Sequence, residues 1–534
     1  MNKNYLIIIA IVAILGGAFL FSKQRFNTPQ KGEFSAQIQQ TNSTKPQEVV
    51  NLKNGDTYNL TASIVKKTIN GVEVKMLAYN NSIPGPLIKV SQGAQITLKF
   101  INNTDVDSTI HSHGVRVDNK FDGVPDITQD PVKPGQSFTY TLKFPDVGMF
   151  WYHPHIREDY AQELGLYGNF LVTPNTPDYW AEVDREEALF LDDILVENGS
   201  TSLTTGGQIA KFDRETVDHT LMGRFGNAML INGEDKYKLS VKQGERVRFY
   251  LTNAANSRVF NFAIPNTRMK LVGSDNGKYE REEWVDAVTI GPSERQIVEI
   301  WFDTDGQYKI QNQTPEKTYT LGTIAVAQNP VTTSFLLVPR TNQDLIDAIN
   351  PLRPMFTKAP DKDIKLTLQM GLSSAQGNDS MGGHMMGNGQ MMQNQQMAMG
   401  TPEKIEWEDD MGMMNAQSTK DSLKWKIVDT ATNKENMDLD WQFKKGDVVK
   451  IKVFNDDKSM HPMQHPIHIH GQKFLVVLTN GQANNNLVWK DTTLIQTGDT
   501  VELLVQMDNP GDWVIHCHIP EHMEAGMMSE FKVI

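Results

Sequence analysis

The chain has 534 residues, which is too long for a single hydrophobic core and predicts about three domains. Apolar residues make up 39% and charged residues 22%, a composition of globular domains rather than of a disordered chain. The formal net charge of −13 argues against nucleic acid as a partner, because the chain has no basic field to meet phosphates.

The first predicted element is an export segment. Lys3 precedes an uninterrupted apolar run at residues 5–21, and Lys23 and Arg25 follow it. This run is at the lower length limit for spanning a bilayer and is long for the core of a cleaved signal. We expect residues 1–25 to be a signal peptide or, by preference, a retained membrane anchor, and residues 26–44 to be a linker. The body of the protein would then work outside the cytoplasm, in a periplasm or at the cell surface.

From about residue 45 the sequence consists of short segments in which polar and apolar residues alternate, separated by Gly, Pro, Asn and Asp. Helical periodicity is scarce. This pattern predicts an all-β fold of antiparallel sandwiches or barrels. Examples of such segments are residues 94–102, 137–144, 246–252, 296–302 and 448–454.

One phrase occurs three times: a glycine turn followed by an alternating strand that ends in Asn. The copies lie at residues 92–102, 243–253 and 445–455, each near the middle of a third of the chain. The repetition predicts three related β domains. Prolines cluster in the intervening linkers, so we place the domains at residues 45–175, 185–340 and 360–534.

The third domain contains a segment of unusual composition. Ten of the 25 methionines lie at residues 381–414, and residues 380–400 consist largely of Met, Gly, Gln and Asn. Low complexity of this kind predicts an insertion outside the core, which we place at about residues 375–414.

Ten of the 13 histidines fall into four clusters. A single pair of this kind is most often two satisfied surface histidines, but four such clusters in one chain indicate metal binding. Side chains at positions i and i+2 of a strand share a face, so each pair can reach one metal from a rigid support. Neutral imidazole suits copper, and the absence of cysteine pairs argues against structural zinc. The clusters are His111 and His113; His153 and His155; His465, His468 and His470; and His516, His518 and His522.

Cys517 is the only cysteine, so no disulfide can form within the chain. A buried core cysteine is the ordinary interpretation, but the histidines on both sides favour a metal ligand. A blue copper centre needs two His and one Cys in a plane with a weak axial thioether. His465, Cys517 and His522 can supply the plane, and Met527 can supply the thioether. Because side chains alternate, the two histidines beside Cys517 face away from it and can hold other coppers.

Together these motifs resemble those of the multicopper oxidases. The resemblance covers nearly all of the chain after residue 45 and rests on residues 148–155, 465–471 and 516–522, with Met527. It implies three cupredoxin-like Greek-key β-sandwich domains. It also implies four copper ions, one of type 1, one of type 2 and two of type 3, which take electrons singly from a substrate and reduce dioxygen to water.

The resemblance assigns a ligand set. It places type 1 copper on His465, Cys517, His522 and Met527, type 2 copper on His111 and His468, and the type 3 pair on His113, His153, His155, His470, His516 and His518.

The acids near the copper sites match the family only in part. Asp122, nine residues after His113, matches the acid that delivers protons near the trinuclear cluster; a surface aspartate before a turn is the alternative. Some bacterial members have a second acid directly after the last type 1 histidine, where Met523 stands here. Glu521 and Glu524 are the candidates to replace it.

The electron donor remains open between two classes of substrate. Bacterial cuprous oxidases carry a methionine-rich insertion in the third domain, and thioethers bind soft Cu(I) well. Met463, two residues before His465, matches a methionine of their substrate site, whereas His461 replaces an acid. We therefore favour Cu(I) as the substrate. Our candidates for binding it are Met463, His461, Met411, Met413, Met414 and Asp410.

Two alternatives compete with cuprous oxidation. A laccase-like enzyme for small aromatic reductants needs an open apolar cleft, which a methionine-rich lid would obstruct. A copper-sequestering protein without turnover does not need the complete set of ligands for a cluster that reduces dioxygen. We expect a monomer that binds no nucleic acid and that contacts the membrane through residues 5–21 if that segment is retained.

Overall fold

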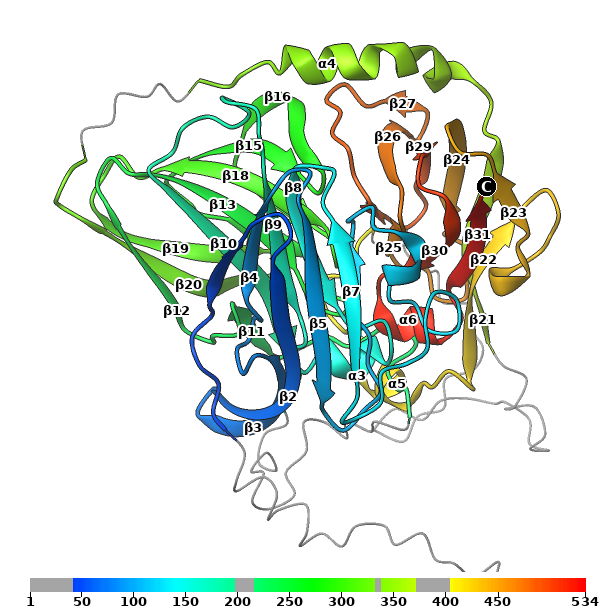
Figure 1. Ribbon diagram of the computed structural model, residues 1–534, viewed down its shortest axis with the longest axis horizontal. Coiled ribbons are helices and arrows are strands. Elements are labelled where there is room, and N and C mark those ends of the chain that lie inside the picture. The colour runs from blue at the N-terminus through cyan, green and yellow to red at the C-terminus, as the bar shows by residue number, and fades with distance from the viewer. Residues whose placement is uncertain (1–41, 197–215, 332–337, 371–403) are drawn as a thin grey trace, which may run out of the picture.

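The computed structural model describes residues 42–196, 216–331, 338–370 and 404–534 (Figure 1). The expected export segment at residues 1–25, the linker as far as residue 41 and residues 371–403 of the methionine-rich insertion lie outside the described residues. No helix within the described residues is long and apolar enough to cross a membrane.

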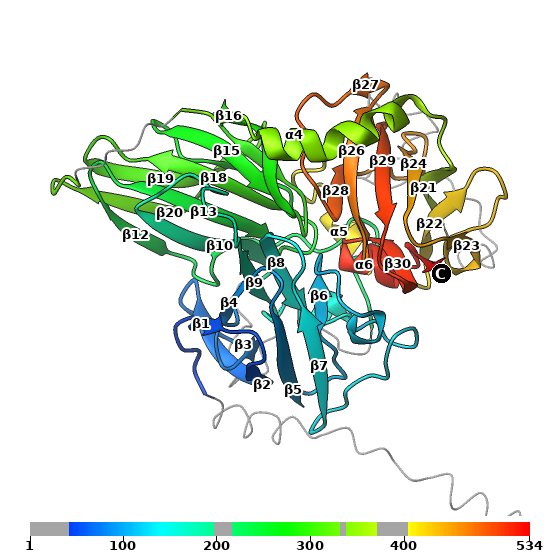
Figure 2. The ribbon, with the colours of Figure 1, turned by 45° about the horizontal axis from the view of Figure 1, so that its top comes forward.

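The fold is all-β, as the alternating segments predict, and its strands form three pairs of sheets (Figures 1 and 2). In the first pair, one sheet has the order β3-β2-β5-β7 and the other β1-β4-β9-β8-β6. The strands are β1 (Val49–Leu52), β2 (Thr57–Ile69), β3 (Val72–Tyr79), β4 (Leu87–Ser91), β5 (Gln95–Asn103), β6 (His111–His113), β7 (Ser137–Lys143), β8 (Gly148–His153) and β9 (Gly168–Thr173), with the helical turns η1 (Asn119–Phe121) and α3 (Glu158–Ala161).

The second pair of sheets has the orders β11-β10-β13-β18-β15-β16 and β12-β20-β19-β14-β17. Its strands are β10 (Arg185–Ile194), β11 (Ala228–Ile231), β12 (Tyr237–Lys242), β13 (Arg246–Asn253), β14 (Phe260–Ala263), β15 (Arg268–Ser274), β16 (Gly277–Val285), β17 (Val288–Ile290), β18 (Arg295–Trp301), β19 (Gly306–Gln313) and β20 (Thr318–Ala327).

The third pair has the orders β22-β21-β24-β29-β26-β27 and β23-β31-β30-β25-β28. Its elements are β21 (Lys362–Met370), α5 (Gly412–Gln417), β22 (Leu423–Asp429), η4 (Asn436–Asp438), β23 (Trp441–Phe443), β24 (Asp447–Asn455), β25 (His465–Ile469), β26 (Lys473–Thr479), β27 (Gln482–Ala483), β28 (Thr492–Ile495), β29 (Thr500–Met507), β30 (Gly511–Cys517), α6 (Pro520–Glu524) and β31 (Met528–Val533). The three pairs agree with three sandwich domains; the domain boundaries given above remain predictions.

The repeated phrase forms the same strand in each domain, namely β5, β13 and β24. Its terminal asparagine is buried each time, and its side-chain amide donates to two backbone carbonyls. Asn102 binds the carbonyls of Val106 and Val132, both at 2.8 Å. Asn253 does the same in the second domain, and Asn455 in the third. The asparagine therefore ties the end of a central strand to two other segments of its domain, which explains its recurrence.

The expected linker between the second and third domains is largely helical. It contains α4 (Gln343–Ile349) and the 3₁₀ helix η2 (Asn350–Thr357), and both views show α4 lying across the top of the second and third domains (Figures 1 and 2). Ile349 is fully buried against Leu475 and Leu504 of the third domain. The apolar face of this segment thus finds a surface to cover, which stabilises a helix where the prolines alone suggested a loop.

Candidate metal centre

Short paired strands carry the histidine clusters to one place between the first and third domains. β6 pairs antiparallel with β8 and sets His111 opposite His153. In the third domain, β25 pairs with β30 and sets His468 opposite His516. Figure 2 shows β6 next to β30 and α6. All ten clustered histidines are buried, so the clusters face one another and not the solvent.

The histidine nitrogens converge in small groups within which every ligand atom lies within 4.8 Å of the others. The expected type 2 pair falls into one group, and the six expected type 3 histidines divide into two groups of three. Each of these groups draws on both the first and the third domain, whereas the group with Cys517 lies within the third. These groups are His111 with His113 and His468; His113 with His153 and His518; His155 with His470 and His516; and His465 with Cys517 and His522; a fifth group joins His111 and His470 to Asp122.

Backbone carbonyls fix the orientation of four of these rings. The Nδ1–H of His111 donates to the carbonyl of Asp122 at 2.8 Å, and that of His468 donates to the carbonyl of Asp491 at 2.8 Å. His153 and His516 each bind a neighbouring carbonyl in the same way. Their Nε2 atoms are therefore the ones that remain for a metal. The Nε2 atoms of His111, His155 and His468 are buried and have no hydrogen-bond partner.

His113 is turned the other way. Its Nε2 lies 2.8 Å from Oγ1 of Thr492 and 3.1 Å from Oδ1 of Asp491. Its Nδ1 instead faces Nε2 of His153 at 3.4 Å. Because the proton on Nε2 has an acceptor, Nδ1 is the free nitrogen of this ring.

Burial lowers the pKa of nine of the clustered histidines. It lowers the pKa of His465 to about 3 and that of His516 to about 4. In seven others the pKa lies well below the ordinary value, because burial and then repulsion between neighbouring histidines disfavour the charged ring. These imidazoles are neutral at neutral pH, which is the form that binds metal.

The third-domain group has the geometry of a trigonal site. Sγ of Cys517 lies 3.5 Å from Nδ1 of His465 and 3.8 Å from Nδ1 of His522, and the two nitrogens are 3.4 Å apart. Burial raises the pKa of the Cys517 thiol, so the thiolate needs a bound cation to stabilise it. Met527 is buried beside it, and its carbonyl accepts a hydrogen bond from the backbone N–H of Cys517 at 3.1 Å.

These groups fit copper. A buried nitrogen without a partner costs about 1–3 kcal/mol, which a bound metal offsets. Neutral imidazoles together with one thiolate are the ligands that copper prefers, and the trigonal group matches a blue copper centre.

Comparison with known proteins agrees with this geometry. Three models of multicopper oxidase domains match residues 59–177, 200–338 and 401–534. The chain belongs to the multicopper oxidase family. It is therefore a copper-binding oxidoreductase, and its three sandwiches are cupredoxin-like domains, as the sequence predicts.

Individual relatives of this multicopper oxidase are distant but nearly full-length. A multicopper oxidase of Staphylococcus aureus is 25% identical over 469 residues, which cover 86% of this chain and 83% of that protein. Copper resistance protein A of Escherichia coli is 24% identical over an alignment that covers 90% of this chain and 93% of that protein. The structure of a metallo-oxidase from Campylobacter jejuni superposes with a TM-score of 0.66 at 22% identity, covering 93% of this chain and 96% of that one. This last likeness concerns the fold alone.

Asp122 is not a surface residue of the oxidase, as the alternative interpretation held, but is 1% exposed. Its Oδ2 accepts a hydrogen bond from Nδ1 of His470 at 2.8 Å, and its Oδ1 has no hydrogen-bond partner. Gly123 holds it in place: this residue has a φ of +84°, and a Cβ there would lie 2.2 Å from the carbonyl oxygen of Ile110. The carboxyl therefore lies beside the metal groups.

Three polar residues of the centre are not among those that the histidine motifs predict, namely Asp491, Thr492 and Glu158. Asp491 and Thr492 contact His113 from almost 380 positions away, and nothing local signals such a contact. Glu158 is fully buried with its carboxylate 3.7 Å from Nδ1 of His155, and burial raises its pKa well above the ordinary value. Its position three residues after His155 is a signal that sequence reading missed. Glu521, one of the two candidates for the second acid, is also fully buried, and burial raises its pKa to about 8.

The candidate Cu(I) ligands lie in different environments. Met463 is fully buried next to the trigonal group, and Met411 packs against the same core. His461 is partly buried, and its Nε2 has no partner. Asp410, however, is exposed, and the carboxylate close enough to act on His461 is Asp409. On α5, Met413 is 79% exposed and Met414 is 55% exposed.

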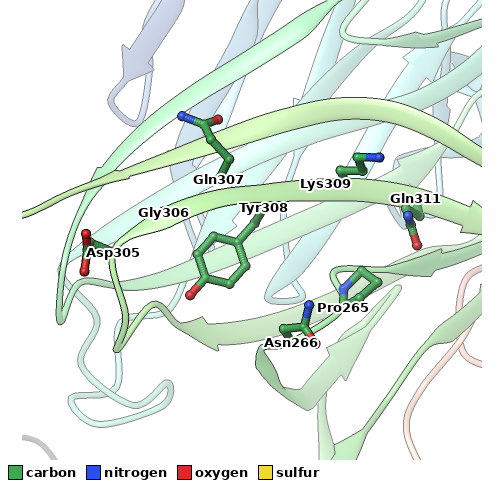
Figure 3. A pocket seen from close by; sticks show the side chains of 8 residues that line it. All are labelled: Pro265, Asn266, Asp305, Gly306, Gln307, Tyr308, Lys309 and Gln311. Atoms are coloured by element: carbon green, nitrogen blue, oxygen red, sulfur yellow. The ribbon is translucent and has the colours of Figure 1, made fainter.

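A polar pocket of about 450 Å³ lies elsewhere, on β19 and the loop before β15 in the second domain (Figure 3). Its wall contains neither histidine nor cysteine, so it has no part in the metal centre. The residues around it are Pro265, Asn266, Asp305, Gly306, Gln307, Tyr308, Lys309 and Gln311.

Proposed function

We propose that this multicopper oxidase is a cuprous oxidase, which takes electrons from Cu(I) and passes them to dioxygen. The observation that carries the proposal is the covered type 1 group: His465 is 1% exposed and His522 is 0% exposed. A phenol needs an apolar cleft that reaches such a histidine, whereas a small ion needs only a few donor atoms. A laccase-like oxidation of small aromatic compounds is the alternative.

The cover over the type 1 group comes from the second domain. Leu221 and Met222 belong to the same apolar cluster as Cys517. Their backbone N–H groups donate to Ser418 Oγ at 2.9 Å and Asn415 Oδ1 at 3.0 Å, at the end of α5. Residues 220–223 are therefore fixed to the third domain directly over the site.

Trp425 completes the cover. Its ring lies 4.3 Å from that of His522 and 4.9 Å from that of His465, measured between ring centres. Its Nε1–H donates to the carbonyl of Thr220 at 2.8 Å, which ties it to the covering segment. The large ring of Trp425 occupies space that an aromatic substrate would need.

We propose that Cu(I) reaches His465 through a cluster of Asp409, Met411, His461 and Met463. Thioether and imidazole are soft donors suited to Cu(I), and the carboxylate adds charge. Asp409 is held in place, because it accepts hydrogen bonds from the N–H of Met411 at 3.1 Å and from Nδ2 of Asn415 at 3.0 Å. The exposed Met413 and Met414 lie on the adjacent helix α5 and lead toward this cluster.

The ligand set implied by the family resemblance is proposed here for the resident coppers, one of type 1, one of type 2 and two of type 3. Copper bound there supplies the one-electron steps and the reduction of dioxygen. Cys517 contributes the direct covalent connection, because its two neighbours His516 and His518 point into the groups shared with the first domain. Asp122 is proposed to hold a proton on its unpartnered Oδ1 and to release it toward those groups.

The proposed location of the enzyme is outside the cytoplasm, with residues 5–21 as a signal or an anchor. The apolar run at those residues supports export. Fractionation of cells that produce the full chain tests this proposal. A full chain that remains in the cytoplasm at its full mass would contradict it.

Oxygen uptake with Cu(I) or with a phenol as donor tests the cuprous oxidase proposal. We expect His461→Ala to lower kcat/KM for Cu(I) by about tenfold or more, the effect of about 1.4 kcal/mol of lost binding. Oxidation of the phenol should not fall. Met437→Ser, which removes an exposed methionine of the third domain outside the histidine groups, is the matched control. An equal loss of kcat/KM with Cu(I) and with the phenol in His461→Ala would favour the laccase-like alternative.

The methionine-rich insertion can be tested without shortening the chain. Replacing the seven methionines at residues 381–399 by Gln keeps the length and polarity but removes every thioether of that stretch. If the insertion collects Cu(I), KM for Cu(I) rises while phenol oxidation stays the same. An unchanged KM for Cu(I) would show that the insertion is not a delivery site. It would not affect the proposed role of His461.

A further inference from the structure

Residues of all three domains meet directly behind the metal centre, around an ion pair between the second and third domains. Among the described residues, the second domain contributes no member to the histidine groups. It does contribute Arg295, the first residue of β18, which is fully buried. Burying a guanidinium costs free energy unless each of its N–H donors has an acceptor. The residues that accept from Arg295 are therefore the ones whose position it can fix.

Arg295 joins the other two domains. Its Nη1 donates to Oδ1 of Asp491 at 2.7 Å, and its Nη2 donates to Oδ2 of the same carboxylate, in a two-pronged ion pair. Its Nε donates to the carbonyl of Met149 at 2.9 Å, on the strand that ends at His153. Asn276, also of the second domain, donates to Oδ2 of Asp491 at 2.9 Å.

Asp491 in turn contacts two histidines. Its Oδ1 lies 3.1 Å from Nε2 of His113, and its backbone carbonyl accepts the Nδ1–H of His468 at 2.8 Å. The two rings stack, with their centres 3.7 Å apart and their planes 15° apart. Thr492 Oγ1 also lies 2.8 Å from Nε2 of His113 and donates to Oδ1 of Asp491 at 2.9 Å. The carboxylate of Asp491 therefore helps to orient the ring of His113, and its backbone carbonyl orients that of His468.

The backbone at Gly114 packs tightly against this ion pair. Gly114 follows His113 directly and has a φ of +80°. A Cβ at that position would lie 2.2 Å from Oδ2 of Asp491 and 3.0 Å from Nη2 of Arg295. The backbone of the first domain therefore passes in contact with a pair formed by the second and third.

We infer that Arg295 is a positioning residue for the trinuclear copper site. Through Asp491 it holds the Nε2–H of His113, which leaves Nδ1 of that ring facing the metal, and it fixes the neighbouring ring of His468. Without the guanidinium, the buried carboxylate loses its cationic partner and keeps the neutral donors Asn276 and Thr492, so its hold on the ring of His113 weakens. This inference rests on the proposed assignment of His113 and His468 as copper ligands.

The test compares three variants of the full-length, copper-loaded protein. Arg295→Met removes the charge, Arg295→Lys keeps it without the two-pronged geometry, and Arg248→Met is the matched control. Arg248 is also a buried arginine of the second domain, but it pairs with Glu299 and Glu186. The readouts are copper per chain, the blue type 1 absorption, and the electron paramagnetic resonance spectrum of type 2 copper.

We expect Arg295→Met to weaken copper binding at the trinuclear site by about 10–100-fold, as loss of a residue that orients a metal ligand does elsewhere. Its type 1 absorption should remain, Arg295→Lys should restore part of the lost copper, and Arg248→Met should bind copper normally. The inference is wrong if Arg295→Met and Arg248→Met lose equal amounts of copper, or if Arg295→Met keeps the type 2 spectrum of the parent protein.

Asp491→Asn gives a second measurement should Arg295→Met fail to fold. This substitution keeps the size of the side chain and an oxygen for His113, but it ends the ion pair with Arg295. We expect an altered type 2 spectrum with the type 1 absorption intact, and an unaltered spectrum would overturn the inference. If instead the proposed copper ligands are wrong, the parent protein itself lacks a type 2 spectrum. The two failures can therefore be told apart.

Discussion

The orientation of each histidine ring in the metal centre depends on which of its two nitrogens finds an acceptor. Where a backbone carbonyl lies near Nδ1, as at His111 and His468, the ring presents Nε2. Where a carboxylate and a hydroxyl lie near Nε2, as at His113, the ring presents Nδ1. The metal-facing atom is thus selected before any metal binds, which lowers the reorganisation that binding requires.

Asp122 allows a prediction at the same scale. In Asp122→Asn the side chain keeps its shape but cannot carry a proton between its Oδ1 and the metal groups. We expect reoxidation by dioxygen to slow by about 10²-fold or more, the size of a general acid contribution. Reduction of the type 1 site should keep its rate, since Cys517 and its partners lie in a separate group.

Stopped-flow absorption separates the two half-reactions of the Asp122→Asn protein. Anaerobic bleaching of the blue band by Cu(I) measures reduction, and its return on mixing with dioxygen measures reoxidation. Normal reoxidation with a normal copper content would remove Asp122 from proton delivery. A loss of bound copper would instead point to its hydrogen bond with His470 as the main role.

At the scale of elements, the strand that ends in asparagine has the same structure in all three domains but different neighbours. Asn455 holds the carbonyl of Met463 at 2.8 Å and that of Ile495 at 3.0 Å. Asn253 holds the carbonyls of Arg258 and Ile290 in the second domain. Only the third-domain copy thereby fixes the segment that leads into the type 1 ligands.

Substituting these two asparagines separates stability from function. Asn455→Ala and Asn253→Ala each leave two carbonyls without a donor, at about 1–3 kcal/mol for each group that stays buried. We expect calorimetry to show a lower unfolding midpoint for both variants. Only Asn455→Ala should also raise KM for Cu(I), because it frees the backbone at Met463. Equal kinetic effects of the two substitutions would argue against a local role for Asn455.

Considered as a whole molecule, the fold and the site differ in how far the sequence predicts them. Alternation within a strand is local, so residues 94–102 and 246–252 were identified as strands nearly to the residue, as β5 and β13. The histidine pairs were recognisable for the same reason. The contacts of Arg295 with Asp491, and of residues 220–223 with α5, join segments almost 200 positions apart and depend on how domains pack. No local pattern encodes such contacts. The sequence does not predict the helix α4 in the linker, because its apolar face is defined only by the domain that it covers.

The number of protons that the whole chain releases when copper binds depends on whether the buried histidines are charged beforehand. A histidine with the ordinary pKa of about 6.5 is about three-quarters protonated at pH 6, so nine of them would release about seven protons on binding metal. Here burial lowers the pKa of nine clustered histidines, to about 3 for His465 and about 4 for His516, so the folded chain is already neutral at these positions. The Cys517 thiol has a raised pKa and must lose its proton to bind.

We therefore expect anaerobic loading of the metal-free protein with Cu(I) at pH 6 to release about one proton from Cys517 and fewer than three in all. A pH indicator in weakly buffered solution measures the release directly. Cys517→Ser should release about one proton less, which identifies the source. Release of about seven protons would mean that the clusters are open to water before copper binds. The neutral, preformed groups on which the ring orientations depend would then exist only in the loaded protein.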